Sequence, residues 1–93
     1  MQDEKSLARK AMVRPDSMQM LIDLEAGARG VVRQLRGGNE FANRIATLGF
    51  TIGAEIAVIQ NYGRGPVIVA VRDTRVALGR GEAAKVLVEV VRA

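Results

Sequence analysis

The chain has 93 residues, enough for one domain with a single hydrophobic core. It is 48% hydrophobic but holds only two phenylalanines, one tyrosine and no tryptophan, so its core must be built from Val, Ile, Leu and Ala. Such side chains favour a compact β structure over a fold organised around large rings. Histidine and cysteine are both absent, which removes the commonest general base, the thiol nucleophile and the usual zinc ligands. We therefore expect a protein that is not an enzyme.

The formal net charge is +4, from 14 basic and ten acidic residues. The basic residues are scattered, and no long run of like charges forms an arm for nucleic acid. Several arginines fall at positions expected on strands: Arg29, Arg33, Arg72 and Arg75. Two interpretations are open, a solvated outer face, which we favour, and a small barrel that binds nucleic acid.

No stretch approaches the ~20 apolar residues of a membrane-spanning helix. The sequence after Met1 lacks the apolar stretch of a secretory signal, and the absence of cysteine is compatible with a reducing compartment. The sequence thus predicts a cytoplasmic protein with no direct membrane insertion.

Residues 1–17 differ in character from residues 18–93, because their charges nearly balance and only one short apolar stripe interrupts them. We expect residues 1–17 to be a mobile extension and residues 18–93 to form the domain.

The first expected strand comes after Gly27-Ala28. Its alternation places Val31 and Leu35 on one side and Val32 on the other, and Gly37-Gly38 ends it.

A short helix is expected at residues 39–48. Asn39 is a candidate N-cap. Three apolar residues recur at i, i+4 and i+7, namely Phe41, Ile45 and Leu48. Gly49 stands where a left-handed C-terminal cap belongs, so Phe50 would fold back over the last turn.

Four further strands are expected after this helix, at residues 55–60, 67–71, 76–78 and 86–91, with a helical turn at 81–85. The strand at 67–71 is apolar on both faces, as a central strand is. Asn61 to Pro66 is a dense turn signal between two strands. Five short strands joined by tight turns predict a mainly β, SH3-like antiparallel barrel that is partly closed.

Two glycine patterns resemble phosphate-binding motifs without their context. Residues 79–84 match G-x-G-x-x-A, but only nine residues come after them, too few for a βαβ unit. Gly37-Gly38 lacks the lysine and hydroxyl of a P-loop. Asp23 and Glu25 are the nearest pair of acids, and two carboxylates are a poor metal site. We therefore expect no cofactor and no metal.

Three segments resemble the ferrous iron transport protein A (FeoA) family. Residues 44–53 (RIATLGFTIG) are similar to its R-L-x-x-L-G-(F/L)-x-x-G signature, with Ile45 where leucine is usual. Residues 65–69 (GPVIV) are similar to its G-P-(I/V)-x-(V/I) strand. Residues 76–86 (VALGRGEAAKV) are similar to its V-A-L-x-x-x-x-A-x-x-I ending. The three occur in the family's order and spacing, over residues 20–91.

The resemblance implies a cytoplasmic accessory of bacterial ferrous iron uptake. Such a protein acts with a large membrane permease, FeoB, whose cytosolic region binds GTP. The SH3-like domain would dock on that region and regulate it. The resemblance leaves open whether the chain forms a homo-oligomer.

Two alternatives are kept. One is a small barrel that binds nucleic acid, which the scarcity of stacking rings disfavours. The other is a stimulator of the permease's GTP hydrolysis that lends Arg44 or Arg64 to the transition state, although structural pairing is the favoured role of Arg44. For the partner contact itself we expect Tyr62 and Arg64, with Phe50 if it is not fully buried.

Overall fold

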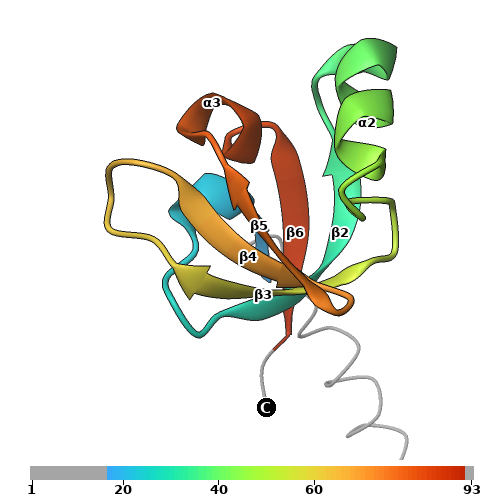
Figure 1. Cartoon of the computed structure of the whole chain (residues 1–93). Helices are drawn as coiled ribbons and strands as arrows, with labels where there is room; N and C mark the ends of the chain where they lie inside the picture. The colour runs from blue at the N-terminus through green and yellow to red at the C-terminus, as the bar shows by residue number, and fades with distance from the viewer. Residues whose placement is uncertain (1–16, 92–93) are drawn as a thin grey trace, which may run out of the picture.

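Six antiparallel strands make one sheet in the order β1-β6-β2-β3-β4-β5 in the computed structural model, which describes residues 17–91 (Figure 1). The strands are β1 (Met18–Met20), β2 (Arg29–Leu35), β3 (Glu55–Gln60), β4 (Val67–Val71), β5 (Thr74–Leu78) and β6 (Val86–Val91). A 3-10 turn, η2 (Leu21–Asp23), and two helices, α2 (Gly38–Ala46) and α3 (Arg80–Ala83), complete the fold. The expected mainly β, antiparallel architecture is confirmed. The extension expected over residues 1–17 lies, apart from the buried Ser17, outside the described residues.

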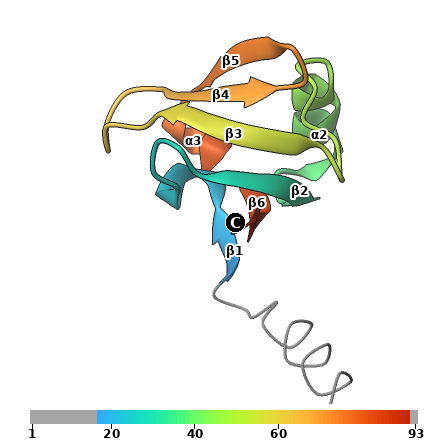
Figure 2. The same ribbon diagram turned by 90° about the horizontal axis from the view of Figure 1, so that it is seen from below.

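The sheet curls without closing. Within residues 17–91 no ladder joins β1 to β5, so these two strands are its edges. Figure 2 shows β5, β4, β3 and β2 side by side, and both views place α2 at one end of them. The sheet therefore has one more strand than expected and is more open. β1 is only three residues long, too short to display a period.

The core lies inside this curl and is almost entirely aliphatic. β4 is central, between β3 and β5, and its inward residues Val67, Val69 and Val71 are at most 1% exposed. Phe50 is the largest fully buried side chain. The strand bounds expected at residues 55–60, 67–71 and 86–91 are confirmed, because apolar residues recur there with the period of a strand.

One expectation about β2 is wrong. The register of β2 against β6 shifts between Val32 and Gln34, which is a bulge. Val32 is fully buried, and beyond the bulge Leu35 also packs against the core, opposite Val86. Val31 instead lines the outer face. Val31 and Leu35 therefore do not share a face, because the extra residue changes the alternation.

Both ends of α2 differ from the expected bounds, since the helix runs over Gly38–Ala46 rather than residues 39–48, but the expected C-terminal cap agrees. The helix begins at Gly38, so the N-cap expected at Asn39 is wrong, and no side chain caps this end. At the other end the N–H of Phe50 donates to Ile45 O (3.2 Å) and that of Gly49 to Ala46 O (2.9 Å). These are the two bonds of a Schellman motif. Gly49 has φ 103°, so the left-handed cap is confirmed.

Candidate functional site

The β3–β4 loop, residues 61–66, projects from one end of the sheet (Figure 1). Tyr62 is 76% exposed, the largest exposed fraction among the big apolar and aromatic side chains described. Arg64 is also exposed. Gly63 and Gly65 have φ 82° and 71°, conformations that glycine adopts without a steric penalty. The loop therefore presents a ring and a guanidinium on a backbone turned by two glycines.

Asn61 anchors this loop to the body of the domain. Its Nδ2 donates to the carbonyl oxygens of Ile22 (2.9 Å) and Leu24 (2.8 Å). Its Oδ1 accepts from the backbone N–H of Gly63 (3.1 Å) and from Arg80 Nη1 (3.1 Å). The spacing Asn61-x-Gly63 is an Asx-turn signal that the sequence contains.

Arg80 supplies the second attachment. Besides Asn61, its Nη1 donates to the carbonyl oxygen of Gly65 (3.3 Å). Arg80, at the start of α3, thereby holds the C-terminal side of the loop at Gly65. Sequence reasoning missed this contact, because Asn61 and Arg80 are 19 positions apart and nothing in their spacing pairs them.

The structure does not bring all the expected contact residues together. Phe50 is expected at the contact only if it is not fully buried. It has no exposed surface, so it belongs to the core and not to the contact. Arg44 lies on α2, at the opposite end of the sheet from the β3–β4 loop (Figures 1 and 2). Its Nε is 3.6 Å from Glu82 Oε2, and its guanidinium carbon is 5.7 Å from the centre of the Phe41 ring. Only Tyr62 and Arg64 share one surface.

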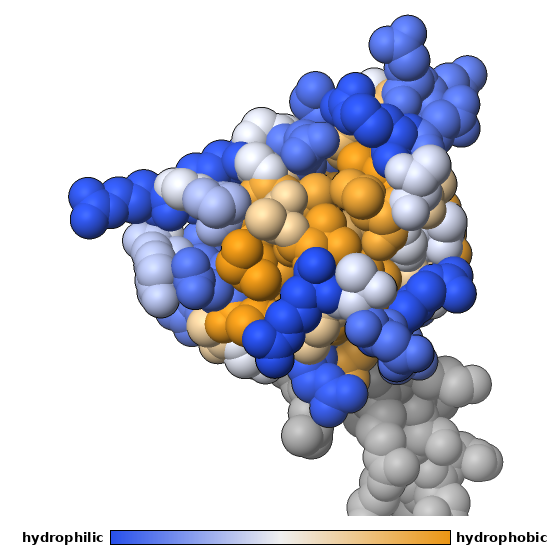
Figure 3. All heavy atoms as spheres, viewed as in Figure 1, coloured by the Kyte–Doolittle hydropathy of each residue, from blue (hydrophilic) through white to orange (hydrophobic). Residues whose placement is uncertain are grey.

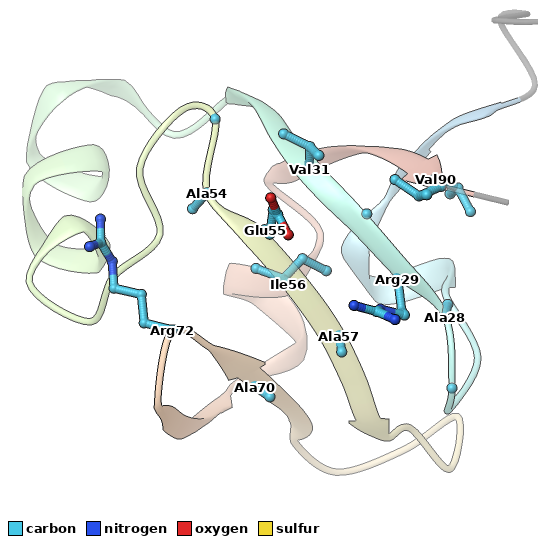
Figure 4. Close-up of a pocket in the computed structure, with 14 residues that line it drawn as sticks. Ala28, Arg29, Val31, Ala54, Glu55, Ile56, Ala57, Ala70, Arg72 and Val90 are labelled. Carbon is cyan, nitrogen blue, oxygen red and sulfur yellow. The ribbon is translucent and has the colours of Figure 1, made fainter. Parts of the chain in front are cut away.

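A second surface feature lies on the outer face of the sheet, away from the core. It is an open groove of about 1090 Å³ over β2, β3 and β4 (Figure 4). Arg29, Glu55 and Arg72 extend from it, while its floor is made of small and apolar residues. Figure 3 shows that the face carrying β4 and β5 is apolar at its centre, with hydrophilic side chains around it.

Two findings concern metal ions and membranes. Within residues 17–91 no group of three or more acidic, histidine or cysteine side chains could hold a metal ion. Asp23 and Glu25 are both exposed. No helix in that part of the chain is long and apolar enough to span a bilayer.

A short antiparallel sheet that curls around one aliphatic core is the architecture of a small SH3-like domain. Residues 19–90 match the family model of the FeoA domain. The chain belongs to the FeoA family, a family involved in Fe(2+) transport.

Two relatives show the range of the family. A protein of Methanocaldococcus jannaschii, provisionally named Fe(2+) transport protein A, is 35% identical over 63 residues, which are 68% of this chain and 76% of that protein. The Fe(2+) transport protein A/FeoB fusion protein of Porphyromonas gingivalis is 36% identical over 72 residues, 76% of this chain but 8% of the fusion.

Solved structures agree with this assignment. The crystal structure of an iron uptake regulatory protein FeoA has a TM-score of 0.77 at 31% identity, covering 80% of this chain and 99% of that one. The FeoA of Stenotrophomonas maltophilia is described as a procaryotic SH3 domain protein and was solved with zinc. It has a TM-score of 0.65 at 31% identity, covering 75% of this chain and 88% of that one. The SH3-like fold is thus confirmed. A manganese-dependent transcriptional repressor, at 20% identity and a TM-score of 0.69 over 80% of this chain and 42% of its own, shares the fold alone.

Proposed function

We propose that this chain is a cytoplasmic accessory of ferrous iron uptake that binds the cytosolic, GTP-binding region of a FeoB-like permease. The observation that carries the proposal is the fusion protein of P. gingivalis, in which a similar domain and FeoB belong to one polypeptide. A covalent link raises the effective concentration of one partner near the other, and is useful where the two act together. The chain acts by binding and does not catalyse a reaction.

The β3–β4 loop is the contact surface in this proposal. Tyrosine and arginine are enriched among the residues that dominate interface energetics. Tyr62 is exposed and the loop is held by Asn61 and Arg80, so little backbone freedom is lost when the loop docks.

A second candidate role concerns GTP hydrolysis by the permease. Arg64 forms no ion pair with any acid among residues 17–91, whereas Arg44 faces Glu82. Arg64 is therefore better placed than Arg44 to enter another protein's site. An arginine supplied in trans to a GTPase accelerates hydrolysis by roughly 10³–10⁵. GTP turnover by the permease's cytosolic region, measured with the wild-type chain and with Arg64→Lys, tests this role. A fall to the unstimulated rate supports it, and unchanged stimulation contradicts it.

Uptake of radiolabelled ferrous iron tests the main proposal. A strain lacking this chain is complemented with the wild type, with Tyr62→Ala/Arg64→Ala, or with the control Arg75→Ala, which removes one exposed arginine on β5. We expect the double variant to match the uncomplemented strain and the control to match the wild type. Wild-type uptake by the uncomplemented strain would contradict the role in iron transport.

A further inference from the structure

The outer groove holds two arginines without an acidic partner. Arg33 pairs with Glu89 at 2.7 Å and Arg44 faces Glu82 at 3.6 Å, and these are the ion pairs found within residues 17–91. Arg29 and Arg72 form none in that part of the chain, although both are exposed. In Figure 4 they lie on opposite sides of the groove.

Part of the groove floor consists of small residues. Arg29 on β2 pairs in register with Ala57 on β3, Ala57 with Ala70 on β4, and Ala70 with Arg75 on β5. Adjacent strands are ~4.8 Å apart, so beyond Arg29 this part of the floor carries only methyl groups, and Arg72 lies two positions after Ala70. The groove, about 1090 Å³ in volume, is open along the sheet, whereas small-molecule sites are concave pockets that bury most of their ligand. This open shape suits a segment of a macromolecule.

Glu55 decides which kind of macromolecule fits. Its carboxylate extends from β3 between the two arginines (Figure 4), and it forms no ion pair within the described part of the chain. A phosphate backbone laid across the groove would be repelled by this charge. The lining also contains no aromatic ring on which a base could stack. The order of charges across the groove is positive, negative, positive.

We propose that this groove binds a segment of a partner protein in which two carboxylates flank a basic residue. The carboxylates pair with Arg29 and Arg72, and the basic residue pairs with Glu55. The alanines of the floor let the segment lie close to the sheet. None of residues 61–66 lines the groove, so this surface is separate from the β3–β4 loop and the inference does not depend on the permease.

Selection from a library of short random peptides tests the proposal. The full chain is immobilised, enriched peptides are synthesised, and their dissociation constants are measured. The variants are Arg29→Glu/Arg72→Glu and, as a control with the same change in net charge, Arg36→Glu/Lys85→Glu, whose residues are exposed and lie outside both the groove and the β3–β4 loop. Circular dichroism verifies that each variant is folded.

We expect the enriched peptides to carry acidic residues on both sides of a lysine or arginine. Their affinity should fall by about tenfold or more in Arg29→Glu/Arg72→Glu and by less than about twofold in the control. Glu55→Lys should lower the affinity for the same peptides. Binding to this variant should recover when the central basic residue of the peptide is exchanged for glutamate.

Five outcomes would overturn the inference, of which the first four concern the peptides and nucleic acid. These four are the absence of any enriched peptide, the enrichment of neutral or basic peptides, equal losses in the two charge-reversed variants, and tighter binding of an oligouridine at Arg29 and Arg72. Self-association that Arg29→Glu/Arg72→Glu abolishes would assign the groove to a second copy of the chain, which also contradicts the proposal.

Discussion

The side-chain amide of Asn61 donates a hydrogen bond to the backbone carbonyl oxygen of Leu24 over 2.8 Å. This bond joins the β3–β4 loop to the segment that enters β2, across 37 positions of sequence. The same side chain also binds Ile22 and accepts from Arg80. One asparagine thus connects the loop, the start of the domain and α3.

Asn61→Ala should lower the free energy of unfolding by ~1–3 kcal/mol, because it leaves two carbonyl oxygens without their donor. Urea denaturation measures this. Asn39→Ala is the control, since Asn39 is exposed and caps no helix, and it should stay within ~0.5 kcal/mol of the wild type. Equal midpoints for Asn61→Ala and the wild type would show that water replaces the amide at no cost.

Gly49→Ala should cost ~1–2 kcal/mol. The residue has φ 103°, which L-residues rarely adopt, and an added Cβ would lie 3.3 Å from a methyl carbon of Val71. The denaturation midpoint in urea is the measurement. An unchanged midpoint would mean that the C-terminal end of α2 rearranges around the new methyl group.

Gly30→Ala should be more destabilising than Gly49→Ala, with a total loss of ~1–3 kcal/mol or more. Gly30 is buried in β2, and a Cβ there would clash with Val88 and lie 2.6 Å from the backbone oxygen of Glu89. Both atoms belong to the neighbouring strand β6, which cannot move without disturbing the sheet. Gly81→Ala is the matched control, because nothing lies within 4 Å of its added methyl group and it should be neutral or slightly stabilising. Thermal unfolding of the two variants compares them, and similar melting temperatures would contradict the close approach of β6.

Arg72→Gly should raise stability while it removes a charge from the groove. Arg72 has φ 55° in the two-residue turn between β4 and β5, a conformation that costs a non-glycine residue ~1–2 kcal/mol. Glycine avoids this cost. It also makes the unfolded chain more flexible, which lowers the stability by ~0.5–1 kcal/mol. The expected net gain is therefore ~0.5–1 kcal/mol in urea denaturation. A loss of stability would mean that the Arg72 side chain makes a contact that outweighs its backbone strain.

Much of the fold was predictable because the apolar residues of β3, β4 and β6 alternate or run uninterrupted. The bounds of these strands follow from that pattern and from the glycines and proline around them. The bulge in β2 was not predictable, because an inserted residue leaves no mark in the hydrophobicity of Val32 or Leu35. Nor was the start of α2, where Gly38 enters the helix at φ 82° and no side chain caps the end.

The candidate site was predictable only in part. A tyrosine and an arginine in a glycine-rich turn indicate an exposed loop, and Tyr62 is exposed as expected. Burial of Phe50 depends on how the chain folds back after Gly49, which composition alone does not decide. The groove arises from the register that places Arg29, Ala57 and Ala70 in one row, and register is a property of the sheet as a whole.

Direct binding of the permease's cytosolic region to the folded chain tests the central claim. The dissociation constant is measured by calorimetry for the wild type, for Tyr62→Ala/Arg64→Ala and for the control Arg75→Ala. The account predicts binding by the wild type and the control, and an affinity lower by about tenfold or more for the double variant, equivalent to ~1.4 kcal/mol. Equal affinities for all three proteins would contradict the assignment of the β3–β4 loop, and absence of binding by the wild type would contradict the partner itself.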